Sequence, residues 1–255
     1  MKPTHFLVCA AAVAAIGACN AKPSDVATNT PVKLEQVPPP KGGDWTQVVT
    51  QTPSGSFVMG NPDAKVKLIE YGSMTCPHCR EFDEAGVAKL VDTYVKSGQV
   101  SYEFRNYVRD AFDLAASLIA RCNGAKSFFP LTRALYKDQP NWVQKIQSAP
   151  RDQLEALQTM DSAQVPVQAA GFAGLPDWAA ARGIAPAKSN QCLSNTATLN
   201  QLVEMTSNAT EEYPDFPGTP TFIINGKMVD LGQITAEQVW PALEAKIRGA
   251  IGERG

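Results

Sequence analysis

The sequence predicts an α/β domain in which a β-sheet is interrupted by a helical insertion. Three observations support this layout: a strand–helix–strand pattern over residues 57–108, a helical region over about 110–212, and a strand–strand–helix pattern from residue 221 onward. A strand–helix–strand unit builds parallel sheets, and strands that follow a long helical block can rejoin the same sheet. The expected order is therefore βαβ, a helical block, and ββα.

The first part of this layout is centred on a Cys-X-X-Cys segment. Residues 57–59 are expected to form a short strand and residues 66–71 an apolar strand, with a turn between them. Cys76-Pro77-His78-Cys79 follows, and a helix should then continue to about Lys96, where Ser97-Gly98 closes it. Residues 100–108 are again rich in residues that favour strands.

The second part contains the helical block and a hairpin. Apolar residues recur at helical spacing over 111–122, and prolines and glycines divide the remainder into several short helices. Thr221-Phe222-Ile223-Ile224 has strand character, and Asn225-Gly226 is a two-residue hairpin signal. Thr235 and Gln238 fit a capping box for a final helix, which Pro241 should kink near its start.

Composition and charge exclude several classes of function. The 255-residue chain is 44% hydrophobic, enough for a sizeable core, and its formal net charge is −2. Without a basic excess to neutralise phosphates, we expect no nucleic-acid partner. His5 and His78 are the only two histidines, which excludes a histidine-rich metal site. A Ser-His-Asp hydrolase would have to use His78, because His5 lies in the leader.

The N-terminal residues have the features of an export signal. Lys2 precedes an apolar run over 6–16 that is too short to cross a bilayer as an ordinary helix. The run ends in Ile16-Gly17-Ala18-Cys19, which resembles a bacterial lipobox with Cys19 as the lipidated residue. The alternative is a plain cleavable signal with an incidental cysteine. Residues 1–19 are interpreted as a signal peptide, and the proline-rich residues 20–54 as an extended or disordered tether.

Export would place the cysteines where disulfides persist. The sequence has six cysteines, and four remain if Cys9 is removed with the leader and Cys19 is acylated. Four thiols allow three pairings. We expect Cys76 to pair with Cys79, and Cys122 with Cys192.

The Cys-X-X-Cys segment combines a helix start with two thiols. Cys76 would occupy the cap and Pro77 the first helical position, where the missing N–H costs nothing. Unpaired N–H groups and the positive helix end would face the Cys76 sulfur and lower its pKa. Cys79, one turn into the helix, would be shielded and act as the resolving thiol.

His78 favours an oxidising couple over the alternatives. A cation beside the Cys76 thiolate would stabilise the reduced form and so raise the reduction potential. A lone Cys-X-X-Cys can also be half of a zinc site completed by Cys122 and Cys192. Structural zinc sites place their second pair close together in sequence, whereas these two cysteines are far apart, so no metal is expected.

Glu70 and Thr219-Pro220 are further candidates for the site. In an alternating strand Glu70 shares a face with Val66 and Leu68, so a core-facing strand would bury its carboxyl group. A buried carboxyl has a raised pKa and could accept the Cys79 proton. The strand pattern equally allows Glu70 to reach solvent. A proline at a strand start, as in Thr219-Pro220, can be cis.

Taken together, these residues resemble the DsbA family of the thioredoxin superfamily. The resemblance is carried by residues 68–79, with Glu70 six residues before Cys76, and by Gly218-Thr219-Pro220 with the hairpin through Lys227. It implies a thioredoxin fold with an inserted helical domain: residues 55–109 and 213–255 would form the thioredoxin-like domain, and residues 110–212 the insertion.

The same resemblance assigns a role to each site residue. Cys76 would be the nucleophile, Cys79 the resolving thiol, Glu70 the buried proton acceptor and Pro220 a cis-proline. The backbone of Thr219 would pair with a bound substrate strand. The implied partners are exported cysteine-containing proteins and a quinone-linked membrane protein. The implied location is the periplasm, with Cys19 as an anchor, and the only redox group is the cysteine pair.

The sequence departs from the pattern of the DsbA family at two places, and each departure leaves an alternative function open. Thr219 stands before the proline where the best-known oxidases carry valine, so a disulfide isomerase or reductase of the same fold is the alternative to an oxidase. Cys122 and Cys192 form a cysteine pair that the simplest members of the DsbA family lack. We interpret this pair as a structural disulfide, and the alternative is a second redox-active pair. A zinc-binding or structural lipoprotein is the remaining hypothesis.

Overall fold

A computed structural model describes residues 1, 34–39 and 42–252, and all of these except Met1 belong to one unit, Val32–Gly255. The predicted signal peptide and Cys19 lie outside the described residues. Within the described part of the chain, no helix is both long enough and apolar enough to cross a membrane.

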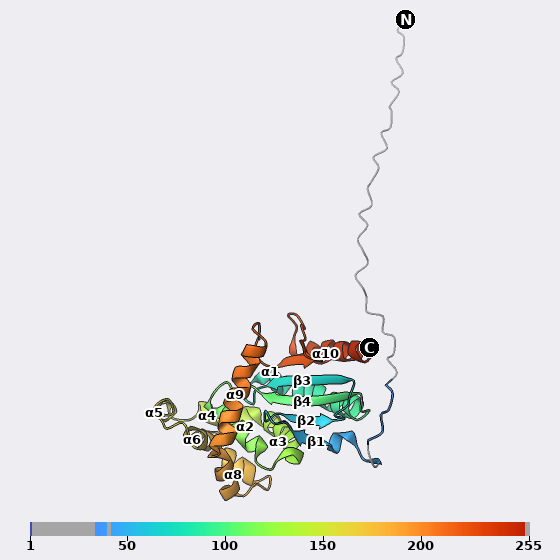
Figure 1. Ribbon diagram of the computed structural model, residues 1–255. Coiled ribbons are helices and arrows are strands. Elements are labelled where there is room, and N and C mark those ends of the chain that lie inside the picture. Colours follow the sequence, from blue (N-terminus) through green and yellow to red (C-terminus); the bar gives the residue numbers. More distant parts are fainter. Residues whose placement is uncertain (2–33, 40–41, 253–255) are drawn as a thin grey trace. The chain divides into compact units, whose positions relative to one another are not determined.

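The unit Val32–Gly255 has a mixed six-stranded sheet with helices packed around it (Figure 1). The strands lie in the order β1-β2-β4-β3-β5-β6. Only β3 and β4 are parallel, which confirms the predicted strand–helix–strand unit, and the other neighbouring strands are antiparallel. Their bounds are β1 Val49–Gln51, β2 Phe57–Gly60, β3 Val66–Gly72, β4 Val100–Asn106, β5 Thr221–Ile224 and β6 Lys227–Met228.

The helical crossover between β3 and β4 carries the Cys-X-X-Cys segment. It begins as an α-helix, α1 (Pro77–Phe82), and continues as two π-helical segments, η3 (Asp83–Val87) and η4 (Leu90–Val95). The sequence predicted one regular α-helix up to about Lys96. The length of this helical segment is confirmed, but most of it is π-helical. Gly86 in η3 lets Trp240 come close, because an added Cβ would lie 2.9 Å from the Trp240 ring.

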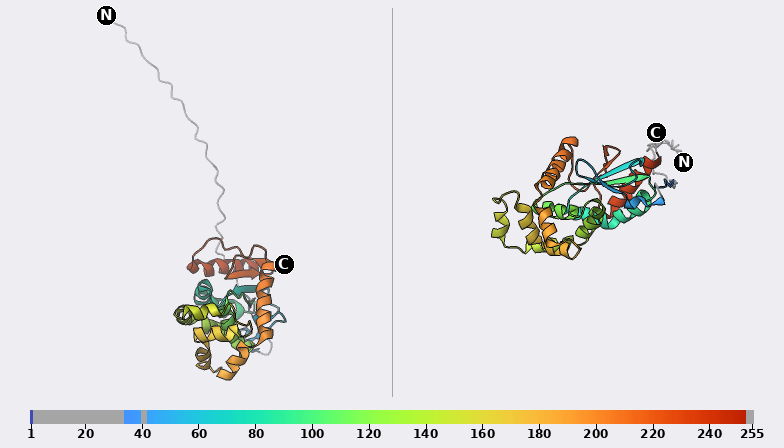
Figure 2. Two further views of the ribbon diagram at one scale, coloured as in Figure 1. Left: turned by 90° about the vertical axis from the view of Figure 1, so that its left-hand side faces the viewer. Right: turned by 60° about the horizontal axis from the view of Figure 1, so that its bottom comes forward.

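The predicted helical insertion lies between β4 and β5. Figure 2 shows the helices of the insertion packed together at one end of the sheet. The last of them, α9, also contacts β4. Prolines occupy the first turn of four of its helices, α4, α6, α7 and α8, as expected for a residue without a backbone N–H. The bounds are α2 Ala111–Arg121, α3 Ala125–Lys137, α4 Gln139–Gln147, α5 Arg151–Ala156, α6 Val165–Ala173, α7 Leu175–Ala180, α8 Pro186–Leu193 and α9 Thr196–Glu212.

The C-terminal hairpin and helix agree with the predicted motifs. Asn225 and Gly226 have φ of 50° and 80°, the left-handed values that a tight two-residue turn needs. The backbone N–H of Thr235 donates to Gln238 Oε1 at 3.0 Å, which is one of the two bonds of the predicted capping box. The final helix, α10 (Ala236–Gly252), contains Pro241 in its first turns.

The predicted tether is wrong for its described part, residues 34–39 and 42–54. The Val37 N–H donates to Ser97 O at 2.9 Å, and the Gln99 side chain donates to Glu35 O at 2.8 Å. Trp45 is only 5% exposed and donates to Val37 O at 2.7 Å, while β1 adds a strand to the sheet edge. Proline-rich composition predicted an extended segment, but a buried tryptophan and paired backbone groups fix it to the domain.

The two faces of the sheet have different roles. Val66, Leu68 and Glu70 of β3 are buried on the face that packs against α1, α3 and α10. Tyr71 lies on the opposite face and packs with Ala209 at the C-terminal end of α9. The predicted alternation of β3 is therefore confirmed, and it places a carboxyl group in the core.

Candidate active site

Cys76 lies where β3 passes through a short loop into α1. It is the N-cap residue of α1, with Pro77 at the first helical position, as predicted. Its sulfur lies 3.2 Å from Thr219 O, and the Thr219–Pro220 peptide bond is cis. Two segments more than 140 residues apart in sequence therefore meet at one sulfur atom.

The surroundings of Cys76 favour its thiolate. Hydrogen bonds with the Cys79 thiol, with Thr219 and with the backbone N–H groups of Cys79 and His78 lower the pKa of Cys76 to about 5, although burial opposes this shift. A thiol with a pKa this low is mainly ionised at neutral pH. Cys76 therefore has the property that a nucleophile and a good leaving group need.

Cys79 has the opposite environment. It is completely buried, and burial raises the pKa of its thiol well above the usual value. The nearby thiol of Cys76 and the charge of Glu70 raise this pKa further. The Ser73 N–H approaches the Cys79 sulfur at 3.5 Å. The two cysteines thus differ sharply in acidity, although only two residues separate them.

Glu70 lies in the core beneath the two thiols. Its side chain is 1% exposed and accepts a hydrogen bond from the Tyr102 hydroxyl at 2.5 Å. Burial raises the pKa of Glu70 to about 8, against the opposing effect of the Tyr102 hydrogen bond. The open question from the strand pattern is thus answered in favour of burial, and the carboxyl group can hold a proton near neutral pH.

His78 has an exposed side chain that contacts Glu81. Its imidazole Nδ1 lies 2.9 Å from Glu81 Oε2, and its side chain is 72% exposed. The Cys76 sulfur is stabilised by the His78 backbone N–H. The peptide group of this residue thus contributes to thiolate stability.

The helical insertion holds the loop before Cys76 through side chains that the sequence did not single out. Gln139 of α4 donates to Met74 O at 2.7 Å and to Cys76 O at 3.0 Å. Asp113 of α2 is completely buried and accepts from the Met74 N–H at 2.8 Å. Burial raises the pKa of Asp113 to about 7. No local pattern marks these two residues, because their contacts depend on how α2 and α4 pack.

Asp83 is a second acidic group close to Glu70 that the sequence did not indicate. It is 7% exposed and pairs with Arg133 of α3 at 3.6 Å. Burial raises the pKa of Asp83 to about 6, and its negative charge contributes to the raised pKa of Glu70. The interior beneath the thiols is thus rich in groups that can carry a proton.

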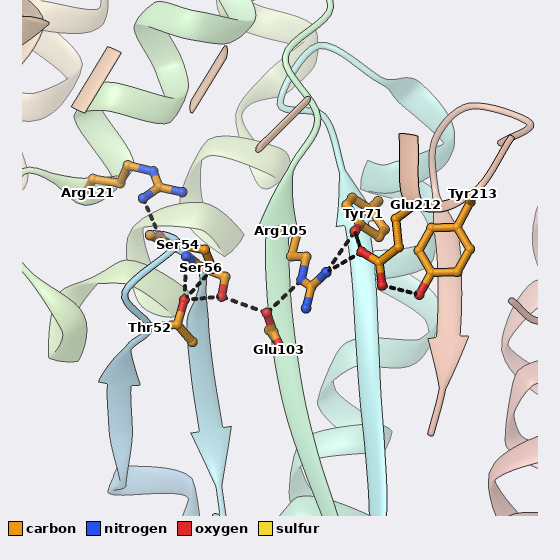
Figure 3. Close-up of polar contacts among 10 residues, drawn as sticks. Thr52, Ser54, Ser56, Tyr71, Glu103, Arg105, Arg121, Glu212 and Tyr213 are labelled. Carbon is orange, nitrogen blue, oxygen red and sulfur yellow. Dashed lines mark hydrogen bonds and ion pairs between the residues drawn. The ribbon is translucent and has the colours of Figure 1, made fainter. Parts of the chain in front are cut away.

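A polar network lies on the other face of the sheet (Figure 3), and its member Tyr71 also packs against Phe216 in the segment before Thr219. Arg105 donates to the Tyr71 hydroxyl at 2.8 Å, and the Tyr71 ring packs edge-on against Phe216 at 5.3 Å. Phe216 in turn stacks on Tyr107 at 4.8 Å. The network runs from Thr52 and Ser56 through Glu103 and Arg105 to Tyr71, Glu212 and Tyr213.

Two hollows flank Cys76. A groove of about 630 Å³ lies between His78, the cis-proline segment and the residues after β6. Its walls include Pro217, Pro220, Leu231, Ile234 and Val239, so it is largely apolar. A smaller pocket of about 360 Å³ contains Cys76 itself, with Tyr107, Arg109 and Thr219 in its wall. An extended peptide beside Thr219 would therefore have room for side chains next to the reacting sulfur.

Cys122 and Cys192 form a disulfide in the insertion, as expected, whereas Cys76 and Cys79, which were expected to pair, are free thiols in this structure. It joins the end of α2 to α8, across 70 residues of sequence. These two cysteines are therefore unavailable to complete a zinc site with Cys76 and Cys79. Within residues 34–39 and 42–252, no cluster of three or more His, Cys, Asp or Glu side chains is arranged to hold a metal ion.

The thioredoxin family model matches residues 52–245. The chain belongs to the thioredoxin family. A protein-disulfide isomerase from Novosphingobium aromaticivorans has a crystal structure that is 30% identical to this chain, with a TM-score of 0.72, and the match covers 78% of this chain and 98% of that one.

More distant relatives agree with this assignment. The crystal structure of Wolbachia pipientis alpha-DsbA1 shares the fold, with a TM-score of 0.57 at 22% identity over 76% of this chain and 90% of that one. A Rickettsia bellii protein whose name places it among the protein-disulfide oxidoreductases is 28% identical over 198 residues, 77% of this chain and 67% of its own. This thioredoxin-family chain is by class a protein-disulfide oxidoreductase, and it shares the fold of the DsbA structure.

The relatives are longer than the matched part of this chain. The matches span 58% to 67% of the length of four Rickettsia relatives. The predicted fold, a thioredoxin fold with a helical insertion, is confirmed by the family match and by the structure. The site residues Glu70, Cys76, Cys79, Thr219 and Pro220 come together, as expected, whereas Cys122 and Cys192 lie within the insertion.

Proposed function

We propose that this chain is an extracytoplasmic dithiol oxidase that introduces disulfides into exported proteins through Cys76 and Cys79. One observation carries the proposal: the pKa of Cys76 is lowered to about 5, while that of Cys79 is raised. A cysteine pair whose nucleophilic member is held as a thiolate is more stable when reduced. Such a pair takes electrons from substrate thiols.

The first step forms a mixed disulfide. A substrate thiolate attacks the Cys76 sulfur of the Cys76–Cys79 disulfide, a new sulfur–sulfur bond forms, and Cys79 leaves with the electron pair. Burial makes a Cys79 thiolate costly, so this sulfur takes up a proton. Glu70 is the candidate donor, because a carboxyl with a pKa of about 8 is mainly protonated at neutral pH.

The second step releases the oxidised substrate. A second substrate thiolate attacks the substrate sulfur of the mixed disulfide, and Cys76 leaves as a thiolate. This departure needs no proton, because the surroundings of Cys76 already stabilise the anion. The substrate has then lost two electrons and the enzyme holds them as a dithiol.

Substrate binding is proposed to use the cis-proline segment. Thr219 O lies 3.2 Å from the Cys76 sulfur, so a substrate strand paired with the Thr219 backbone would present its own cysteine beside Cys76. The largely apolar groove of about 630 Å³ next to this segment would take the substrate's neighbouring side chains. The proposed substrates are therefore unfolded or extended cysteine-containing chains.

Location and reoxidation extend the proposal. The N-terminal sequence supports export to the periplasm with Cys19 as a lipid anchor. A quinone-linked membrane partner would accept the two electrons of the reduced enzyme, as the DsbA resemblance implies. The Cys76–Cys79 pair itself is the proposed redox group, and the mechanism uses no further cofactor.

A disulfide isomerase is the second candidate function. Two observations favour it: the relative from Novosphingobium aromaticivorans is named a protein-disulfide isomerase, and Thr219 precedes the cis-proline in place of valine. An isomerase must be kept reduced, because its Cys76 thiolate attacks disulfides that are already present in the substrate.

A redox titration against glutathione separates the two functions. The oxidase proposal predicts a reduction potential well above about −270 mV, the value of thioredoxin. A potential near that of thioredoxin would rule out the oxidase. Efficient rescue of a scrambled disulfide protein by the reduced enzyme, without added oxidant, would instead support the isomerase.

A further inference from the structure

We infer that Arg109 selects substrates that carry a carboxylate next to the reacting cysteine. The inference rests on the proposed function and names the class of substrate that this site prefers. It starts from the pocket of about 360 Å³ beside Cys76, because Arg109 and the nucleophile share its wall. Gly218 and Tyr107 form other parts of that wall.

The backbone that carries Arg109 is fixed at three consecutive residues. The Tyr107 N–H donates to Gly72 O at 2.8 Å, and the Val108 N–H donates to the Thr206 hydroxyl at 2.8 Å. The Arg109 N–H donates to Asp113 Oδ2 at 3.0 Å. Partners from three different elements thus hold this short segment after β4 in one place.

The last of these partners also fixes the other wall of the pocket. Asp113 accepts hydrogen bonds from the Ser73 hydroxyl at 2.5 Å and from the Met74 N–H at 2.8 Å, in the loop that leads to Cys76. One buried carboxyl group therefore contacts both the Arg109 backbone and the Cys76 loop. The Arg109 backbone is thus held in a fixed position relative to the loop before Cys76.

The guanidinium group itself is available to a ligand. Arg109 is exposed, and none of the described residues forms a hydrogen bond or ion pair with its side chain. The neighbouring Asp110 carboxylate is occupied, since it accepts from the Thr75 hydroxyl at 3.0 Å and caps α2. The imidazole of His78, which also lines the pocket, contacts Glu81. Among the residues that the structure describes, Arg109 is therefore a cation without a partner in the wall of the pocket that Cys76 also lines.

An arginine in this position suits a carboxylate. The planar guanidinium can donate two parallel hydrogen bonds to the two oxygens of a carboxylate, which gives both attraction and orientation. The carboxylate can belong to an aspartate or glutamate next to the substrate cysteine, or to glutathione. The chemistry is the same in both cases, and separate experimental arms distinguish the two sources.

The experiment compares three enzymes on matched peptides. Dithiol peptides that differ only in having Glu, Gln or Lys next to the first cysteine are mixed with oxidised enzyme, and second-order oxidation rates are measured by acid quench. The enzymes are the wild type, Arg109→Gln and Arg151→Gln. Arg151 is an exposed cation on α5, at the far end of the insertion in Figure 1, so this control removes the same charge elsewhere.

The comparison uses the ratio of the Glu and Gln peptide rates in each enzyme. The carboxylate also changes the acidity of the peptide's own thiol, but this effect is identical for all three enzymes and cancels. We expect Arg109→Gln to lower the ratio by about two- to fivefold, as for an accessible ion pair, and Arg151→Gln to leave it unchanged. The difference in this ratio between the wild type and Arg109→Gln should become smaller as the salt concentration rises, because salt screens the ion pair.

Two further arms assign the source of the carboxylate and separate this inference from the proposed function. If glutathione oxidation also slows two- to fivefold in Arg109→Gln, while its diesterified form reacts equally with both enzymes, the site accepts either source. Equal ratios in wild type and Arg109→Gln, together with equal glutathione rates, would overturn the inference. Failure of the wild type to oxidise even the Gln peptide would overturn the oxidase proposal instead.

Discussion

The two cysteine pairs of this protein show how environment decides the chemistry of a thiol. Cys76 and Cys79 are free thiols at the start of α1, surrounded by backbone N–H groups and by the cis-proline segment. Cys122 and Cys192 are joined across the insertion, between α2 and α8. The first pair lies beside an open pocket and has two strongly different pKa values, whereas the second connects helices.

The difference follows from what surrounds each sulfur. At the first pair, the Cys79 thiol and backbone N–H groups stabilise charge on Cys76, while burial disfavours charge on Cys79. That asymmetry makes one sulfur attack and leave readily and keeps the other protected. At the second pair, closing a 70-residue loop restricts the unfolded chain. We therefore propose that the first pair transfers electrons and that the second stabilises the fold.

The largest expected effect comes from removing the nucleophile. Cys76→Ser should abolish oxidation of a dithiol peptide, because no mixed disulfide can form at residue 76. The activity of the double variant Cys122→Ser, Cys192→Ser should stay close to that of the wild type. Peptide oxidation rates test both. Residual activity in Cys76→Ser, or loss of activity in the double variant, would contradict the proposal that only the first pair takes part in the reaction.

The insertion disulfide should matter for stability. The double variant Cys122→Ser, Cys192→Ser should lose about 4 kcal/mol of unfolding free energy, because an unfolded chain without the 70-residue loop gains conformational freedom. Chemical denaturation of both proteins measures this loss. An unchanged unfolding midpoint would contradict the structural role and favour a second redox pair.

Glu70→Gln should alter both rate and pH dependence. Burial raises the pKa of Glu70 to about 8 from its usual 4.5. Between these values the unfolded chain releases a proton that the folded protein keeps, so the wild type loses stability as pH rises. The variant should avoid that loss and gain stability relative to the wild type from pH 4.5 to 8, as measured by denaturation of the reduced proteins.

The same substitution should slow the reaction by roughly 100-fold, because it removes the group that exchanges a proton with Cys79. The exposed Glu204→Gln in α9 is the matched control for charge. A variant with unchanged rates would remove Glu70 from the mechanism, even if its effect on stability appears as expected.

The smallest effect concerns the contact from the insertion to the active-site loop. Gln139→Met keeps the size of the side chain but leaves the carbonyl groups of Met74 and Cys76 without this donor. We expect a loss of about 1–3 kcal/mol in stability and a rise in the pKa of Cys76 as the loop relaxes. The exposed Gln144→Met on the same helix is the control. An unchanged Cys76 pKa would limit Gln139 to a structural role.

Local sequence patterns predicted the parts of the site that depend on local structure. The helix start at Cys76, the face of β3 that Glu70 shares with Val66 and Leu68, and the Asn225-Gly226 turn are all determined within a few residues. The strand pattern left open whether Glu70 reaches solvent, and the packing of helices on that face decides for burial. The contacts of Gln139 and Asp113 depend on how distant helices pack, so no pattern reveals them. The same applies to Trp45, whose burial fixes a segment that composition alone assigned to a tether.

The most direct test of the account is the pKa of Cys76 in the reduced protein. Thiolate absorbance in the ultraviolet, followed against pH with Cys76→Ser as the reference, reports this one group because Cys79 titrates far higher. We expect a midpoint near 5. A midpoint near 8.5, the value of an ordinary cysteine, would contradict the assignment of Cys76 as a stabilised thiolate and leaving group.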